Sequence, residues 1–214
     1  MDVLSALGAA RLVPVVVLDS ASDAGPLGAA LVAGGLPVAE VTFRTAAAED
    51  AIRAMSDRGD MIVGAGTVLT VEQVDRAVGA GARYIVSPGL SRAVVERCGE
   101  HGVVALPGAV TATEIQAALE LGITTVKFFP AATSGGAAAI AALSAPFGGV
   151  RFVPTGGIGP GNVQDYLRLA AVLAIGGSWM VPRDRIASGD FAGITRLTAA
   201  AVELTTAEPR SARP

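Results

Sequence analysis

The chain has 214 residues, of which 51% are hydrophobic and 16% charged, and its formal net charge is −3. This composition excludes a disordered chain, and the slight acidity provides no positive field that would attract nucleic acid or anionic lipid. One cysteine and one histidine exclude an internal disulfide and the usual multi-Cys or His-pair metal motifs, and without a long apolar run or a signal-peptide pattern we expect a soluble, cytoplasmic protein.

Short runs of β-forming residues alternate with alanine-rich helical patterns along the chain. A short helix is predicted at residues 3–10. Eight strands are predicted at residues 13–18, 38–44, 61–64, 84–87, 103–106, 124–129, 151–154 and 172–175. Eight further helices are predicted at residues 24–33, 47–57, 71–78, 92–100, 112–119, 137–143, 161–169 and 191–204.

Residues that cap helices stand at the expected ends of these elements. Hydroxyl residues precede three helices, and Thr111 is followed three residues later by Glu114, the spacing of a capping box. The other two predicted N-caps are Thr70 and Ser91. Glycines follow several helices, where a left-handed C-cap is easily formed, at Gly34, Gly35, Gly81, Gly102 and Gly122.

The repeated strand–helix unit indicates an α/β fold with parallel strands joined by crossover helices. Eight units in this length give about 27 residues each, the spacing of a compact (β/α)8 TIM barrel. A doubly wound open sheet is the alternative, and the short, even units favour the barrel. We therefore predict one barrel domain over residues 1–206, closed at its base by the first helix, and a polar C-terminal tail over residues 207–214.

The unusual residues of the chain fall where these strands end, which is where active sites lie in barrels. Because side chains alternate along a strand, Glu40 and Arg44 are expected on one face of the second strand. Lys127 and Phe129 are expected on one face of the sixth. If both faces point inward, an acid, a guanidinium group and an amine meet in one pocket.

Lys127 is the only lysine among 16 basic residues, and it lies between apolar neighbours rather than in a charged run. Burial away from water favours the neutral amine, which can attack a ketone and form a Schiff base. The alternatives are a buried ion pair with Glu40 or a lysine at a strand end that reaches solvent. Glu40 itself stands inside the apolar run VAEVTF, where it could act as general acid and base or simply as the partner of a cation.

Arg44 and Thr67 together suggest a carboxylate site, because guanidinium binds carboxylate through two hydrogen bonds and a hydroxyl can add another. The alternatives are an ion pair of Arg44 with Glu49 or Asp50, and a helix-capping role for Thr67. Phosphate candidates follow the last two strands, where backbone N–H groups at glycines can approach an anion. They are Gly156, Gly157, Gly177 and Ser178.

Three residues are predicted to have structural roles only. His101 follows a helix on the side remote from the strand ends, as a C-terminal cation or surface residue would. Cys98 is expected to be a small buried apolar residue, and Trp179 to pack beside the eighth loop.

Taken in order, seven motifs resemble the 2-keto-3-deoxy-6-phosphogluconate (KDPG) and 4-hydroxy-2-oxoglutarate (KHG) aldolase family. The resemblance runs from about Val13 to Val202. It is carried by VAGGLPVAEVTFRT, VGAGTVLT, AGARYIVSPGL, LPGAVTATEI, VKFFPA, VPTGGIGPGNVQDYL and IGGSWMVP. It implies a class I aldolase, a carbon–carbon lyase of Entner–Doudoroff carbohydrate metabolism, on a TIM barrel that forms a homotrimer without metal or cofactor.

The resemblance also implies roles for individual residues. The lysine of KFFPA is Lys127, the Schiff-base residue, and the glutamate of EVTFRT is Glu40, the general acid and base. The substrate carboxylate would contact Arg44 and Thr67, and the phosphate would lie on the two glycine loops. Substrate-binding residues implied in this way are Arg44, Thr67, Pro88, Phe129, Thr155, Gly156, Gly157, Gly177 and Ser178.

This resemblance predicts reversible cleavage of KDPG to pyruvate and glyceraldehyde 3-phosphate, and of KHG to pyruvate and glyoxylate. Thr155 in the PTGGI sequence resembles the gluconate-type enzymes more than the galactonate-type ones. The alternatives are an aldolase for the galactonate epimer and a barrel that binds phosphosugars without covalent chemistry. Some members carry a basic residue just past the first strand, where this chain has Leu18, Asp19 and Ser20, so an extra cationic contact to phosphate is not expected from that loop.

Overall fold

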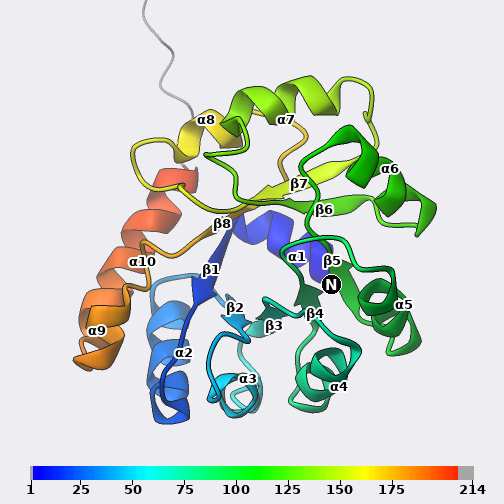
Figure 1. Ribbon diagram of the computed structural model, residues 1–214. Helices are drawn as coiled ribbons and strands as arrows, with labels where there is room; N and C mark the ends of the chain where they lie inside the picture. Colours follow the sequence, from blue (N-terminus) through cyan, green and yellow to red (C-terminus); the bar gives the residue numbers. More distant parts are fainter. Residues whose placement is uncertain (1, 207–214) are drawn as a thin grey trace, which may run out of the picture.

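The computed structural model describes residues 2–206 as a set of parallel strands surrounded by helices (Figure 1). The strands are short, and most of their residues are buried. They are β1 (Leu12–Val16), β2 (Val38–Thr42), β3 (Ile62–Gly66), β4 (Tyr84–Val86), β5 (Val104–Leu106), β6 (Thr125–Phe128), β7 (Arg151–Pro154) and β8 (Ile175–Gly177).

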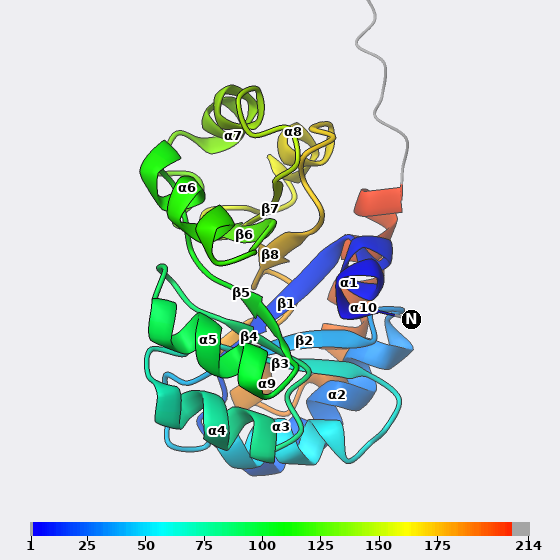
Figure 2. The same cartoon turned by 90° about the vertical axis from the view of Figure 1, so that its right-hand side faces the viewer.

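Helices connect successive strands and lie on the outside of them (Figures 1 and 2). The helices before β5 are α1 (Val3–Ala10), the 3-10 helix η1 (Ala21–Asp23), α2 (Ala24–Ala33), α3 (Ala48–Ser56), α4 (Val71–Gly79) and α5 (Arg92–Glu100). The later ones are α6 (Ala112–Glu120), α7 (Gly136–Ser144), α8 (Val163–Leu167), α9 (Arg183–Ala187) and α10 (Phe191–Thr206).

The strands form two parallel sheets, one of six strands in the order β5-β4-β3-β2-β1-β8 and one of the pair β6-β7. The order runs along the chain without the reversal that defines a doubly wound sheet, and the last strand pairs with the first. Isolated parallel bridges join Gly108 to Lys127 and Thr155 to Gly176, at the two places where the sheets meet. The predicted α/β class with parallel strands is confirmed in this form, as sheets of six and two strands.

The predicted strands and helices agree with the structure apart from a few end residues, with three exceptions: the eighth strand, helix α9 and the three-residue 3-10 helix η1. The eighth strand was predicted at 172–175, whereas β8 covers Ile175–Gly177 and Val172 forms only an isolated bridge with Phe152. In the sequence, Gly176 and Gly177 are typical of a loop. In the structure, their small size lets Thr155 and Trp179 lie directly against the strand. Helix α9, of five residues, was not predicted.

The capping signals are largely confirmed. Thr111 and Glu114 form a complete capping box at the start of α6, and Thr70 and Ser91 accept hydrogen bonds from the first turns of α4 and α5. Positive φ angles occur at four of the five predicted C-cap glycines, Gly35, Gly81, Gly102 and Gly122. Gly34 keeps an ordinary φ of −80° because the left-handed turn falls one residue later.

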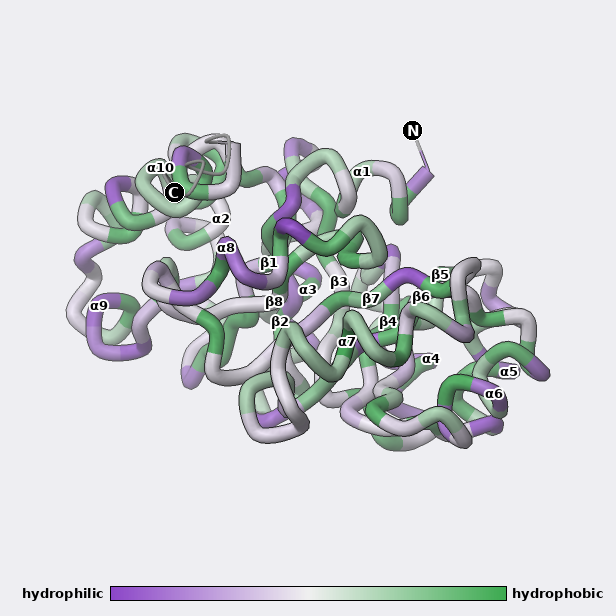
Figure 3. Tube along the Cα trace, turned by 90° about the horizontal axis from the view of Figure 1, so that it is seen from above, coloured by the Kyte–Doolittle hydropathy of each residue, from purple (hydrophilic) through white to green (hydrophobic). Residues whose placement is uncertain are grey.

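Apolar residues gather along the strands and where the helices pack on them, whereas hydrophilic residues lie mostly at the periphery of the molecule (Figure 3). Helix α1 lies at the end of the molecule where the strands begin. Its Gly8 approaches Leu173 just before β8, and both border a small cavity with Arg151, the first residue of β7. This leaves the carboxyl ends of the strands open.

Within residues 2–206, no helix combines the length and the apolar character that crossing a membrane requires. The tail predicted for 207–214 lies outside the described residues.

A cluster of charged side chains joins α4 to α5. Oδ1 of Asp75 lies 2.6 Å from Nε of Arg97 and 2.6 Å from Nε2 of His101. Hydrogen bonds from Arg97, and then from His101, lower the pKa of Asp75 from 3.8 to about 2.

We predict a pH-dependent loss of stability from this cluster. Because the pKa of Asp75 is lower in the folded state, its carboxylate stabilises the fold above about pH 3.8 and loses that effect as the pH falls through about 2. Asp75→Asn should therefore lower the urea midpoint at pH 5, and the difference from the wild type should shrink as the pH approaches 2. A difference that stays constant over this range would show that the carboxylate charge is not its cause.

Candidate active site

A buried ion pair lies between two strands that are not neighbours. Nζ of Lys127, on β6, donates a hydrogen bond to Oε1 of Glu40, on β2, over 3.0 Å. The two side chains are only 7% and 4% exposed. Each charge would be costly to bury alone, so each depends on the other.

The strands that hold Glu40 leave space for its carboxylate. Glu40 stands in register between Val15 on β1 and Gly64 on β3. A Cβ atom at Gly66 would overlap Oε1 of Glu40, so the third strand approaches the carboxylate as closely as a backbone can. The absence of a side chain at Gly66 therefore provides the space that the Glu40 carboxylate occupies.

Tyr84 supports the backbone next to Glu40. A side chain at Gly64 would overlap the Tyr84 ring, and the Tyr84 hydroxyl donates a 2.8 Å hydrogen bond to the carbonyl oxygen of Ala39. Burial, together with the negative charge of Glu40, raises the pKa of Tyr84 well above its usual value. Its hydroxyl stays protonated and fixes the backbone beside Glu40.

Lys127 is held at the junction of the two sheets. Its backbone N–H donates to the carbonyl oxygen of Pro107, and its own carbonyl oxygen accepts from Ala109, so β5 and β6 meet there. Its Nζ lies 5.3 Å from the centroid of the Phe129 ring. The amine is thus covered by an aromatic face, which favours a nearby cation and excludes water.

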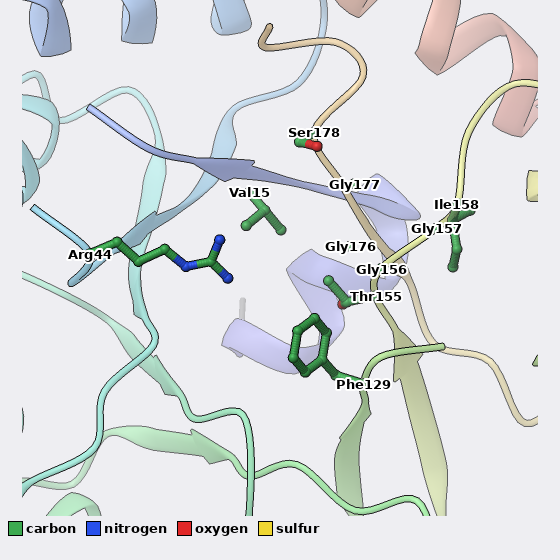
Figure 4. A pocket seen from close by; sticks show the side chains of 10 residues that line it. All are labelled: Val15, Arg44, Phe129, Thr155, Gly156, Gly157, Ile158, Gly176, Gly177 and Ser178. Atoms are coloured by element: carbon green, nitrogen blue, oxygen red, sulfur yellow. The ribbon is translucent and has the colours of Figure 1, made fainter. Parts of the chain in front are cut away.

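A cavity of about 130 Å³ opens next to this ring at the carboxyl ends of the strands. Figure 4 shows the guanidinium group of Arg44 pointing into it from one side and the glycine loops after β7 and β8 forming the other. Its lining residues are Val15, Arg44, Phe129, Thr155, Gly156, Gly157, Ile158, Gly176, Gly177 and Ser178. Phe129 connects the buried amine with this cavity.

The loop after β7 needs glycine at two successive positions. Gly156 and Gly157 have φ angles of 98° and 73°, in the left-handed region that few other residues adopt. A side chain at Gly157 would also meet Ala132 at 2.5 Å. This conformation turns the backbone along the cavity wall and leaves no side chain between its amide groups and the cavity.

Arg44 and Thr67 are in direct contact. Nε of Arg44 donates to Oγ1 of Thr67 over 3.2 Å, while Glu49 pairs instead with Arg53 and Arg76. Thr67 has a φ of 56°, a strained conformation for a β-branched residue that persists only where the surroundings impose it. The contact orients the guanidinium group and leaves its outer nitrogens free to face the cavity.

The structure brings most of the predicted site residues together. Seven of them line the cavity, and Lys127, Glu40 and Thr67 lie behind that lining in contact with each other or with Arg44. Pro88 does not border the cavity, and its carbonyl group lies against Gly108. Arg44 and Phe129 lie just beyond the ends of their strands rather than within them.

Three lining residues were missed by the sequence analysis: Val15, Ile158 and Gly176. Val15 and Ile158 look like ordinary core residues in a sequence, and no signal there separates them from the rest of the core. Gly176 could have been found, since it adjoins the predicted Gly177. Its lack of a side chain makes room for Thr155.

The residues predicted to be structural lie away from the cavity. Burial raises the pKa of the Cys98 thiol to about 11, so it is an unreactive core residue at neutral pH. His101 is the C-cap of α5 and contacts Asp75. Within residues 2–206, no three His, Cys, Asp or Glu side chains gather as a metal site would require.

This arrangement can carry out covalent carbonyl chemistry. A primary amine stands in a dry environment, a carboxylate is within proton-transfer distance of it, and a guanidinium group faces the adjacent cavity. The glycine loops on the far wall offer backbone N–H groups for an anion.

Comparison with known proteins agrees with this reading. Residues 3–197 match the family model for KDPG and KHG aldolase. The chain is 51% identical to the 2-dehydro-3-deoxy-phosphogluconate aldolase of Treponema pallidum over 92% of its own length and 95% of that protein. It is 46% identical to the KHG/KDPG aldolase of Escherichia coli K12, covering 93% of this chain and 94% of that protein.

The fold is also similar to that of a solved structure in which a covalent intermediate was captured. KDPG aldolase from Legionella pneumophila, with pyruvate bound as a carbinolamine, superposes with a TM-score of 0.89 at 39% identity. The match covers 92% of this chain and 96% of that one.

We predict that Gly66→Ala destabilises the protein because the added methyl group displaces the Glu40 carboxylate from its place beside Lys127. Overpacking of this kind costs about 1–3 kcal/mol in unfolding free energy, measurable by urea denaturation. The matched control is Gly79→Ala in α4, where a Cβ atom meets nothing within 4 Å. That variant should gain about 0.5–1 kcal/mol, and equal behaviour of the two would contradict the close approach at Gly66.

Proposed function

This chain belongs to the KDPG and KHG aldolase family, and from that membership and the site geometry we propose that it is a class I aldolase of 2-keto-3-deoxy sugar acids. It reversibly cleaves KDPG to pyruvate and glyceraldehyde 3-phosphate, and KHG to pyruvate and glyoxylate. The single observation that carries the proposal is the buried contact of 3.0 Å between Nζ of Lys127 and Oε1 of Glu40. The covalent pyruvate adduct of the Legionella relative supports the same chemistry.

Lys127 is the nucleophile of the first stage. Glu40 accepts a proton from the ammonium group, and the neutral amine attacks the C2 ketone of the substrate to give a carbinolamine. Glu40 returns the proton to the departing hydroxyl group, water leaves, and a protonated imine remains. The imine can accept the electron pair that the next step releases.

The second stage breaks the carbon–carbon bond. Glu40 takes the proton of the C4 hydroxyl, the C4 oxygen forms a carbonyl, and the electrons of the C3–C4 bond move into the imine to form an enamine. The aldehyde product leaves. The enamine is protonated at C3, and water hydrolyses the resulting imine to pyruvate and free Lys127.

The groups that bind the substrate carboxylate and the phosphate lie on opposite walls of the cavity. Arg44, oriented by Thr67, holds the carboxylate next to the imine, and Phe129 covers the reacting carbons. The phosphate lies on the opposite wall, where Gly156, Gly157 and Ser178 provide backbone and hydroxyl donors. Thr155 and Gly177 complete that wall, and Pro88 stands behind the site.

We further propose that the two sheets are arcs of one closed (β/α)8 barrel, forming a single domain over residues 1–206. The bridges from Gly108 to Lys127 and from Thr155 to Gly176 support this closure, since they lie at both junctions between the sheets. A homotrimer, a cytoplasmic location and a place in the Entner–Doudoroff pathway stay predictions.

The covalent step predicts trapping of pyruvate on Lys127. Incubation with pyruvate and borohydride should add one reduced pyruvyl group to the peptide that contains Lys127, because the imine is reduced to a stable amine. Lys127→Arg keeps the charge but lacks the amine, so it should neither be labelled nor cleave KDPG. Peptide mass spectrometry and a pyruvate-coupled assay measure the two effects.

A matched control introduces a lysine elsewhere. Arg92 is an exposed residue of α5, and Arg92→Lys should be labelled only at position 127, at the wild-type level. Equal labelling at position 92 would attribute trapping to any accessible amine. Wild-type turnover in Lys127→Arg would rule out the Schiff-base mechanism.

Glu40→Gln tests the proton transfers separately from the fold. The amide keeps the size of the side chain and an oxygen that can accept from Lys127, but it cannot take up a proton at neutral pH. We expect kcat for KDPG to fall about 10²- to 10⁴-fold while the circular dichroism spectrum still shows a folded protein, although loss of the ion pair lowers the free energy of unfolding. A reduction of less than threefold would leave Glu40 with a structural role only.

A further inference from the structure

Arg183 stands at the outer edge of the site, on an element that the sequence analysis did not predict. It is the first residue of α9, which follows β8. Its guanidinium group contacts Asp19, which follows β1, and β1 and β8 are paired neighbours. Two loops at the carboxyl ends of adjacent strands are thus joined by one ion pair.

Arg183 borders a second cavity, of about 280 Å³. Both cavities are bordered by Val15, Arg44 and Ser178, so they adjoin one another. Figure 4 shows Val15 beside the guanidinium group of Arg44, and Ser178 on the segment that follows Gly177. The second cavity adds Val17, Val181, Pro182 and Arg183 to that lining.

Most hydrogen-bonding capacity of Arg183 is not used. Its Nη2 atom donates to both carboxylate oxygens of Asp19, each over 2.8 Å. The N–H groups on Nε and Nη1 have no partner within residues 2–206. The two side chains are 60% and 69% exposed, so their attraction is screened by solvent and easily exchanged for another partner.

We propose that Arg183 binds the phosphate group of the longer substrate and thereby sets the preference for KDPG over unphosphorylated KHG. This inference rests on the proposed function. Guanidinium binds phosphate through paired, charge-assisted hydrogen bonds, and Arg183 borders the same cavity as Ser178 of the phosphate wall.

Asp19 weakens phosphate binding, in contrast to Arg183. Without substrate it holds Arg183 over the second cavity, and when phosphate is present its negative charge competes for the same guanidinium group. Arg183 thus exchanges a weak exposed partner for the phosphate dianion. Asp19 therefore opposes phosphate binding through its charge, and phosphate binding does not depend on its contact with Arg183.

Two single variants separate this role from a purely structural ion pair. With KDPG, Arg183→Ala should raise KM about 10- to 100-fold with kcat little changed, because phosphate binding is lost equally in the ground and transition states. With KHG, its KM should stay within about twofold of the wild type. Arg183→Lys should recover part of the affinity for KDPG. Asp19→Asn breaks the same ion pair, yet it should leave the KM for KDPG unchanged or lower it.

Inorganic phosphate provides a second readout as a competitive inhibitor of KDPG cleavage. Its inhibition constant should rise with Arg183→Ala and should not rise with Asp19→Asn. If both variants instead weaken KDPG and phosphate binding alike, the pair is only structural and the inference is wrong. It is equally wrong if Arg183→Ala affects KDPG and KHG to the same extent.

Pyruvate trapping keeps this test apart from that of the proposed function. Wild type and Arg183→Ala should both trap pyruvate on Lys127, because the keto acid end does not reach the outer cavity. If the wild type neither traps pyruvate nor cleaves either substrate, the proposed function itself is wrong. If Arg183→Ala traps pyruvate normally and keeps the wild-type preference for KDPG over KHG, only the role of Arg183 is wrong.

Discussion

The contact between Lys127 and Glu40 is the constraint that the rest of the structure serves. Nζ of Lys127 and Oε1 of Glu40 are kept from water at 3.0 Å from each other, and within residues 2–206 neither side chain forms a second ion pair. Removing either partner would leave an uncompensated buried charge, a cost of about 3–5 kcal/mol. Strands β2 and β6 must therefore be held opposite each other, although they share no ladder.

Small residues around the pair make this placement possible. Gly66 lets the third strand approach the carboxylate, and Gly64 makes room for the Tyr84 ring that supports the backbone at Ala39. Such contacts fix the acid within a narrow range of positions, which matters because proton transfer depends on heavy-atom distances of about 2.6–3.2 Å. The glycines thus contribute to the chemistry by their lack of side chains.

Charge is distributed along the site from the inside outward. The innermost element is the amine with its carboxylate, Arg44 follows at the cavity wall, and the glycine loops and Arg183 lie farthest out. A keto acid with a carboxylate at one end and a phosphate at the other fits this sequence of groups. In the proposed mechanism, the reacting ketone then lies beside Lys127 and Glu40, which exchange its protons.

Residues that are exceptional in the sequence could be predicted, and residues that resemble their surroundings could not. Lys127 and Glu40 stand out as charges within apolar runs, and Gly35 or Gly122 stand out because only glycine readily takes a left-handed turn. Val15 and Ile158 are indistinguishable from core residues. The pairing of Asp19 with Arg183 spans 164 positions and depends on β1 and β8 being neighbours, which no local pattern encodes. The end of β8 was misplaced for a similar reason, since Gly176 is kept in the strand by pairing with Val13 of β1 and by a bridge to Thr155, both distant in the sequence.

The choice of basic residues has a chemical consequence for a protein that handles ketones and aldehydes. Amines on a surface condense reversibly with such compounds, whereas the guanidinium group of arginine stays protonated and does not. This chain uses arginine at every basic position except 127, so the lone side-chain amine is the one under the Phe129 ring. The surface therefore gains cations for ion pairs such as those of Arg97 and Arg76 without adding competing nucleophiles. In the proposed mechanism, covalent chemistry is therefore confined to Lys127, where Glu40 can accept and return the protons.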